Sequence, residues 1–199
     1  MSKLREAFEK GEFAITAEMA PPKGTDLSHL AECAKLVIGR VHAANVTDNQ
    51  SAVMRTSSLA TCKMLKDLGL EPVIQMTGRD RNRIAIESEM LSAGFFGIDN
   101  LLALTGDHVC VGDHKQAKPV FDLDAVSILS TATMMNNGTD STGLELKGKT
   151  DFFLGACVTP EYDPIEVQLL KMEKKIKAGA RFFQTQAVYD LSLIHISEP

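Results

Sequence analysis

The sequence predicts an α/β protein of the (β/α)8 barrel class, and three observations support this. Apolar runs of strand length recur along the chain, with helical periodicity between most of them. Their starts are 28, 31, 28, 52 and 29 residues apart, so all but one interval fits a single βα unit. Two prolines follow the first run, where a doubly wound dinucleotide fold has Gly-x-Gly-x-x-Gly. Because the complete barrel takes about 250 residues, we expect an incomplete TIM barrel of about six βα units.

The predicted strands are apolar runs bounded by polar or turn-forming residues. They cover residues 13–19, 41–46, 72–76, 100–104, 152–158 and 181–186. Helical segments connect most of them, which indicates a parallel sheet.

The predicted helices have apolar residues at helical spacing. They cover residues 27–38, 57–68, 83–93, 123–135 and 167–178. Asp26 is the expected N-cap of the first of these. Gly69, Gly94 and Gly179 follow three others, as expected where a left-handed residue ends a helix. Residues 1–10 predict a short amphipathic helix that lacks the apolar centre of a signal peptide.

The composition excludes several classes of function. The formal net charge of -5 argues against a general binder of nucleic acids or anionic membranes, which carries a basic face. No apolar run approaches the ~18 residues of a membrane span, and the four cysteines form no Cys-x-x-Cys pair. We therefore expect a cytoplasmic protein with reduced thiols and with neither a membrane nor a nucleic acid as partner.

The end of the sequence differs in character from the rest. Residues 191–199 resemble the translation of a sequencing adapter, so we expect a non-native tail there. Residues 1–190 are then expected to form one domain, the part of the barrel that carries the active site. We expect the native sequence to continue beyond Asp190 through two more βα units, and the chain as it stands to assemble its active site incompletely.

Polar side chains follow each predicted strand, at the end where a (β/α)8 barrel has its active site. Glu18 ends the first strand and Asp107 follows the fourth. Burial of an unpaired carboxylate is costly and keeps it protonated near neutral pH, as a general acid requires. We therefore expect Glu18 to be buried, and both carboxylates to face one pocket in different roles. The other polar residues at strand ends are Thr47, Asp48, Asn49, Gln75, Thr77, Thr105, Gly106, Thr159, Glu161, Gln184, Thr185 and Gln186.

These residues also have purely structural interpretations. Glu18 suits an ion pair at the rim of the barrel, and Asp107 suits a turn or a helix cap after Gly106. Thr47 and Gln186 are, taken singly, ordinary strand-end hydrogen-bonding residues. Their joint placement on one face of the barrel favours the functional interpretation.

Two further polar segments need interpretation. The loop that holds His108, Cys110, Asp113 and His114 has no second pair of ligands elsewhere, so we expect a mobile active-site loop and no metal site. Residues 79–83, Arg-Asp-Arg-Asn-Arg, predict a solvated charged loop, although their position after the third strand also suits an anionic ligand.

Five motifs occur in the order and spacing of a known family. They are Glu18-Met19-Ala20-Pro21-Pro22, Val46-Thr47, Met76-Thr77, Ala103-Leu104-Thr105-Gly106-Asp107, and Lys177-Ala178-Gly179-Ala180 followed by Thr185-Gln186. On these motifs the chain, from Phe13 to Asp190, resembles the flavin-dependent methylenetetrahydrofolate reductases, particularly the smaller bacterial enzymes. The resemblance implies an oxidoreductase of one-carbon metabolism and methionine biosynthesis. It would reduce 5,10-methylenetetrahydrofolate to 5-methyltetrahydrofolate by hydride transfer through a bound flavin.

The resemblance also implies roles for individual residues. Glu18 would protonate the folate N10, Asp107 would stabilise the resulting iminium cation, and Gln186 would orient the pterin. The residues near the flavin would be Thr47, Thr77, Thr105, Gly106, Asp107 and Thr159, with Lys175 near its phosphates.

The chain departs from the family pattern where the outer parts of the cofactor would bind. Thr105 stands where the family often has Arg, Thr159 where it has Tyr, and Asp163 where it has His. The following helix carries Gln168, Lys171, Lys174 and Lys175 in place of an Asp, Asn, Arg, Lys series. We expect FAD as the cofactor, with FMN as the alternative.

The resemblance names several partners. The electron donor would be NAD(P)H by family default, or else ferredoxin or a partner flavoprotein, and we expect a homo- or hetero-oligomer. Two other functions stay open. One is a flavin-independent barrel enzyme acting on another pterin or a phosphorylated metabolite, with Glu18 and Asp107 as an acid and base pair. The other is a non-catalytic barrel subunit of an electron-transfer complex.

Overall fold

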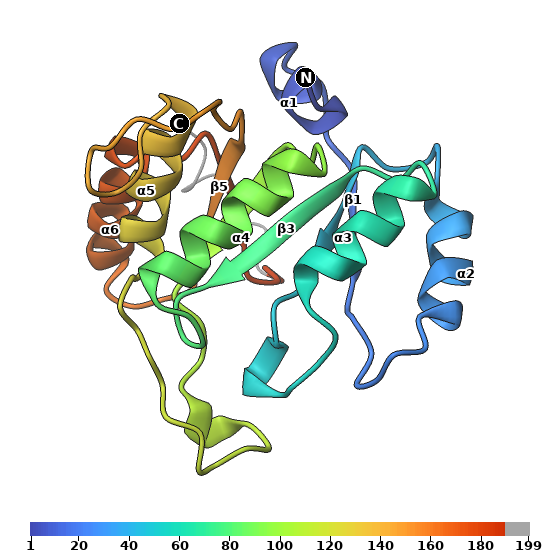
Figure 1. Cartoon of the computed structure of the whole chain (residues 1–199), viewed down its shortest axis with the longest axis horizontal. Coiled ribbons are helices and arrows are strands. Elements are labelled where there is room, and N and C mark those ends of the chain that lie inside the picture. Colours follow the sequence, from blue (N-terminus) through green and yellow to red (C-terminus); the bar gives the residue numbers. More distant parts are fainter. Residues whose placement is uncertain (190–199) are drawn as a thin grey trace.

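The computed structural model describes residues 1–189, which form one curled sheet with helices along its outer face (Figure 1). Its six strands follow one another in chain order, and every neighbouring pair is parallel. This arrangement is that of a (β/α)8 barrel after six units, so the predicted incomplete barrel is confirmed. The proposed tail, residues 191–199, lies outside the described residues.

Each predicted strand and helix is present, with differences of up to three residues at its ends. The strands are β1 (Thr16–Met19), β2 (Ala43–Val46), β3 (Pro72–Thr77), β4 (Asn100–Leu104), β5 (Phe153–Val158) and β6 (Phe182–Thr185). The α-helices are α1 (Lys3–Glu9), α2 (Ser28–Val37), α3 (Ser58–Asp67), α4 (Arg83–Phe95), α5 (Ala125–Asn136) and α6 (Ile165–Lys177). Two 3-10 turns, η1 (Gln50–Ala52) and η2 (Val109–Val111), lie in the loops after β2 and β4.

Two helix ends differ from the prediction. Leu27, and not Asp26, is the N-cap residue of α2, and the Asp26 carboxylate instead accepts a hydrogen bond from the backbone N–H of Ser28 at 2.9 Å. This bond closes a turn before the helix. Helix α4 runs past Gly94, because the left-handed residue that follows it is Gly97, with φ of 69°. The helix therefore contains two more residues, Gly94 and Phe95, than the glycine pattern indicates.

The two faces of the sheet have different environments. Outward side chains such as Val46, Met76 and Leu101 are buried beneath the helices in the main core. Inward side chains at the amino ends of the strands form a second apolar cluster with α1, made of Leu4, Ala43, Val73, Leu102, Phe153 and Phe182. The inward positions nearer the carboxyl ends are polar, as at Thr47 and Gln75. The barrel interior thus changes from apolar to polar toward the end where chemistry is expected.

Gly155 of β5 makes room for the ring of Phe182. The rings of Phe182 and Phe153 are stacked with centroids 5.0 Å apart, and a Cβ at position 155 would lie 2.2 Å from Cζ of Phe182. We predict that Gly155→Ala lowers the free energy of unfolding by about 1–3 kcal/mol, because the added methyl overpacks this cluster. Urea denaturation measures the change. Gly24→Ala, whose added Cβ would meet no atom within 4 Å, is the control, and equal losses in the two variants would contradict the prediction.

Along residues 1–189, no helix is both long enough and apolar enough to cross a bilayer.

Candidate active site

A cleft of about 490 Å³ lies at the carboxyl ends of the strands. Its walls come from all six βα units, so side chains far apart in the sequence meet there. The lining residues are Glu18, Thr47, Asp48, Gln50, Ser51, Gln75, Thr77, Arg79, Leu104, Thr105, Gly106, Asp107, Cys157, Gln184, Thr185 and Gln186. A larger cavity of about 560 Å³, bordered by Arg5, Asp151 and Arg181, lies toward the amino ends of the strands. Barrel enzymes place their chemistry at the carboxyl ends, so we assign the candidate active site to the smaller cleft.

The cleft brings together most of the residues singled out in the sequence. Seven of them line it, namely Glu18, Thr47, Thr77, Thr105, Gly106, Asp107 and Gln186. Thr159 and Lys175 do not line it. The Lys175 ammonium donates to the Cys157 carbonyl at 2.5 Å, and burial lowers the pKa of Lys175. Lys175 therefore bonds to the main chain of β5 and does not reach the cleft, which Cys157 lines.

Glu18 is exposed, so the prediction of a buried carboxylate is wrong for this chain. Strand β1 pairs with β2 on one side, and no other strand among residues 1–189 covers its free edge. Solvent therefore reaches the side chain. The alternative, a rim ion pair, is not formed within the described part of the chain either, since Lys23 in the following loop pairs with Asp113.

Asp107 presents its carboxylate to solvent at the mouth of the cleft. It is not a helix cap, because His108 occupies the N-cap position of η2 and its Nδ1 accepts from the backbone N–H of Cys110. Gly106 before it has φ of 91°, and a Cβ there would lie 3.1 Å from the Cβ atoms of Thr77 and Arg79. A glycine is needed at this position to bring Asp107 so close to β3.

Two buried threonines line the wall of the cleft. Thr47 is 2% exposed, and its Oγ1 has no hydrogen-bond partner among the described residues. Leaving such a group unpaired costs about 1–3 kcal/mol, so a polar ligand atom is expected beside it. The Thr77 hydroxyl donates to Asp48 Oδ2 at 2.8 Å, which leaves its oxygen as an acceptor. This donor and acceptor pair suits the polar edge of a planar heterocycle such as a flavin.

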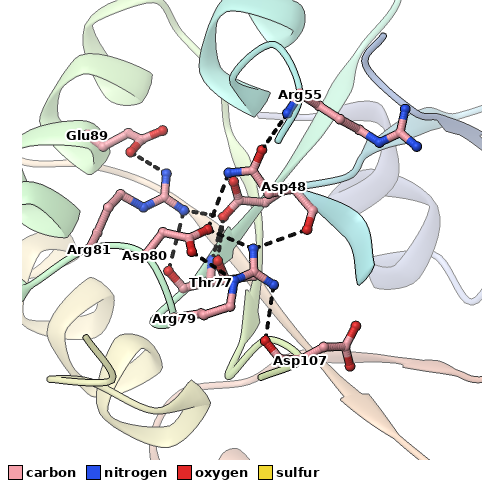
Figure 2. A network of polar contacts seen from close by, with 9 residues as sticks. Asp48, Arg55, Thr77, Arg79, Asp80, Arg81, Glu89 and Asp107 are labelled. Carbon is pink, nitrogen blue, oxygen red and sulfur yellow. Dashed lines mark hydrogen bonds and ion pairs between the residues drawn. The ribbon is translucent and has the colours of Figure 1, made fainter. Parts of the chain in front are cut away.

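A network of buried charges supports that wall, as Figure 2 shows. The Asp48 side chain is 3% exposed and accepts from the backbone N–H of Thr77 at 2.8 Å and from the guanidinium of Arg81. Arg81 also pairs with Glu89 of α4 at 2.5 Å. Burial raises the pKa of Glu89, and the Arg81 charge opposes that rise.

Arg79 lies beside this network and is 2% exposed. Its Nε and Nη2 donate to the two carboxylate oxygens of Asp80 at 2.8 and 2.7 Å, and these bonds lower the pKa of Asp80. The prediction of a solvated loop after β3 is therefore wrong for Arg79 and Arg81. Arg79 is buried and Arg81 is largely shielded, with 17% of its side chain exposed, and carboxylate partners compensate each guanidinium for lost hydration.

The structure adds residues that the sequence interpretation left without a role. All three lie at strand ends and line the cleft: Asp48, Gln75 and Gln184. Asp48 is adjacent to a residue that was assigned a role, and the two glutamines are each two residues from one. The period of two along a strand was the available signal, since it places Gln184 on the same face as Gln186. Arg79 is two residues from Thr77 as well, but β3 ends at Thr77, so the period of two does not extend to it. Its burial depends on partners from other segments.

No group of three His, Cys, Asp or Glu side chains within residues 1–189 is arranged to hold a metal ion. In the loop after β4, Asp113 bonds to His114 and to Lys23 instead. His108 stacks against Phe121 with ring centroids 6.2 Å apart.

Comparison with solved structures shows the fold. Two crystal forms of 2,3-dimethylmalate lyase, a member of the PEP mutase/isocitrate lyase superfamily, align with TM-scores of 0.65 and 0.62 at 11% sequence identity. The alignments cover 98% and 97% of this chain, which spans 66% of the length of the lyase. At this identity the likeness concerns the barrel alone.

Comparison of the sequence with curated proteins found no match. A family model described as methylenetetrahydrofolate reductase matches residues 3–194, nearly the whole chain. The matched region contains every residue of the cleft at the carboxyl ends of the strands. The chain therefore belongs to the methylenetetrahydrofolate reductase family.

Proposed function

We propose that the cleft is the active site of a flavin-dependent oxidoreductase that reduces 5,10-methylenetetrahydrofolate to 5-methyltetrahydrofolate. The family match supports a reductase of this type. The observation that carries the proposal is the meeting of Glu18, Asp107 and Gln186 in one cleft with the buried, unpartnered hydroxyl of Thr47.

Different side chains are proposed to bind different parts of the cofactor. A bound flavin supplies the hydride-transfer chemistry. The Thr47 hydroxyl and the Thr77 oxygen would hydrogen-bond its polar edge, and Gly106, which packs closely against Thr77, would complete that wall. FAD is the proposed cofactor, with FMN as the alternative. Thr105 lines the same wall, while Thr159 and Lys175, near Cys157, are proposed contacts for the outer parts of the cofactor.

Three side chains act on the folate. Glu18 gives a proton to N10, which opens the methylene bridge and leaves a cationic iminium. The ionised carboxylate of Asp107 stabilises that charge. The Gln186 amide can both donate and accept hydrogen bonds, so it orients the pterin by its aminopyrimidinone edge. Because Glu18 is exposed in this chain, solvent can replace its proton between turnovers.

The remaining partners are proposals of the same kind. NAD(P)H is the proposed electron donor, with ferredoxin or a partner flavoprotein as alternatives, in a cytoplasmic homo- or hetero-oligomer. A flavin-independent enzyme acting on another pterin is the second candidate function. It is favoured by the carboxylates Glu18 and Asp107, which suffice for acid and base chemistry without a cofactor.

A flavin titration tests the proposal. The protein is expected to bind flavin, and Thr47→Val is expected to weaken binding about tenfold, the loss of roughly one net hydrogen bond. Quenching of flavin fluorescence measures both affinities. Thr61→Val is the matched control, because the Thr61 hydroxyl on α3 is also buried and has no partner within residues 1–189, but lies outside the cleft. Absence of flavin binding by the unmodified protein would favour the flavin-independent candidate. Equal affinities of the Thr47→Val and unmodified proteins would remove Thr47 from the site.

A further inference from the structure

Arg79 is a buried cation at the edge of an acidic cleft. Of the side chains that line the cleft within residues 1–189, it is the only cation, and Glu18, Asp48 and Asp107 are acidic. Its charge is compensated by Asp80, which accepts from Nε at 2.8 Å and from Nη2 at 2.7 Å. This bidentate geometry fixes the plane of the guanidinium.

The other N–H groups of Arg79 reach two different loops (Figure 2). Nη2 donates to the carbonyl of Asn49, which follows β2, at 3.1 Å. Nη1 donates to the carbonyl of Asp107, which follows β4, at 3.3 Å. One guanidinium therefore joins the loops after β2 and β4 to its own loop after β3. A lysine ammonium lacks the planar fork that makes these contacts together.

The contact with Asp107 is made through the main chain and leaves the carboxylate free. Neither a lysine nor an arginine forms an ion pair with the Asp107 side chain within the described chain, as Figure 2 illustrates for Arg79. Asp80 makes this arrangement stable, because it already neutralises the guanidinium. The carboxylate stays available for a cationic ligand.

We propose that Arg79, held by Asp80, is a positioning residue that fixes Asp107 at the cleft while keeping its carboxylate unpaired. The proposal rests on the proposed function, in which that carboxylate faces the cationic folate. It adds the residue that positions the Asp107 carboxylate, and it assigns different roles to Asp80, which follows β3, and Asp107, which follows β4. Asp80 neutralises the guanidinium of Arg79, and Asp107 remains available to the iminium cation of the folate.

Two variants test this role. Arg79→Lys keeps the charge but loses the fork, and Asp80→Asn keeps the fork but releases the guanidinium to pair with Asp107. Each is expected to slow reoxidation of the reduced flavin by methylenetetrahydrofolate about 10- to 100-fold, as a small misplacement of a catalytic group does. The rate of flavin reduction by the donor, measured at saturating flavin, is expected to stay within twofold of the unmodified protein. Stopped-flow absorbance follows the two half-reactions separately.

Arg83→Lys is the matched control. Arg83 is exposed, lies in the same segment and pairs with Asp122, so this variant is expected to behave as the unmodified protein in both half-reactions. If Arg79→Lys does not fold, Asp80→Asn tests the proposal instead. Asp80 is about one-third exposed, so we expect this variant to fold. Folded variants that reduce folate at the unmodified rate would overturn the proposal, as would an equal slowing of both half-reactions.

A measurement without flavin or folate separates this proposal from the proposed function. The backbone N–H groups of Val120 and Phe121 bond to the carbonyls of Arg79 and Gly78, which ties the loop after β4 to the segment that carries Arg79. Millisecond hydrogen exchange over residues 105–121 is expected to be at least threefold faster in Arg79→Lys than in the unmodified protein. Unchanged exchange would refute the positioning role even in an active enzyme. Faster exchange in a protein that binds no flavin would refute only the proposed function.

Discussion

Glu18→Gln is expected to lower the rate of methylenetetrahydrofolate reduction by about 10²–10⁴-fold, the usual contribution of a general acid. Glutamine has nearly the shape of glutamate but cannot supply the proton that opens the methylene bridge. Reduction of the bound flavin by the donor needs no proton from this side chain, so that half-reaction is expected to continue at its normal rate. Rapid-mixing absorbance measurements on the two half-reactions check both statements.

The control for this variant is Glu12→Gln. Glu12 is an exposed carboxylate that precedes β1 and lies outside the cleft, so its removal changes the net charge by the same amount. Its variant is expected to reduce both flavin and folate normally. Normal folate reduction by Glu18→Gln would remove Glu18 as the acid. A loss of both half-reactions would instead indicate that flavin binding had been damaged.

Asp48→Ala is expected to lower the free energy of unfolding by about 3–5 kcal/mol, the cost of breaking a buried ion pair from one side. The Asp48 carboxylate accepts bonds from the backbone N–H and the hydroxyl of Thr77 and from Arg81. Alanine leaves the N–H unpaired and gives Arg81 a single carboxylate partner, Glu89. Urea denaturation followed by circular dichroism measures the loss.

An exposed aspartate provides the comparison. Asp67 pairs with Lys63 on α3, and its side chain is 61% exposed. Asp67→Ala is expected to change the free energy of unfolding by less than about 0.5 kcal/mol, because a solvated ion pair contributes little. A loss at position 48 no larger than that at position 67 would show that the network in Figure 2 adds nothing to stability.

Much of the fold was predictable because it depends on local patterns. Period-two and helical spacing are set by backbone geometry, so the strands and helices could be located to within three residues. The glycine pattern failed only at Gly94, where no local signal shows that Gly97 ends the helix instead.

The site was predictable in part. Parallel strands of a barrel bring their carboxyl ends to one rim, so Thr47, Asp107 and Gln186 could be expected to meet. The charged segment after β3 could not be interpreted in the same way. Arg81 is shielded from solvent by Asp48 and Glu89, and Arg79 bonds to the carbonyls of Asn49 and Asp107. The hydrophilic character of a residue carries no information about such partners.

The residue pattern was therefore sufficient for the parallel barrel, for its family and for the side chains placed at its rim. Burial and pairing were decided by tertiary structure, which exposes Glu18 on the free edge of β1 and buries Arg79 between three loops. The reason is that strand periodicity follows from neighbours along the chain. The environment of a charge is created by segments that meet only after folding.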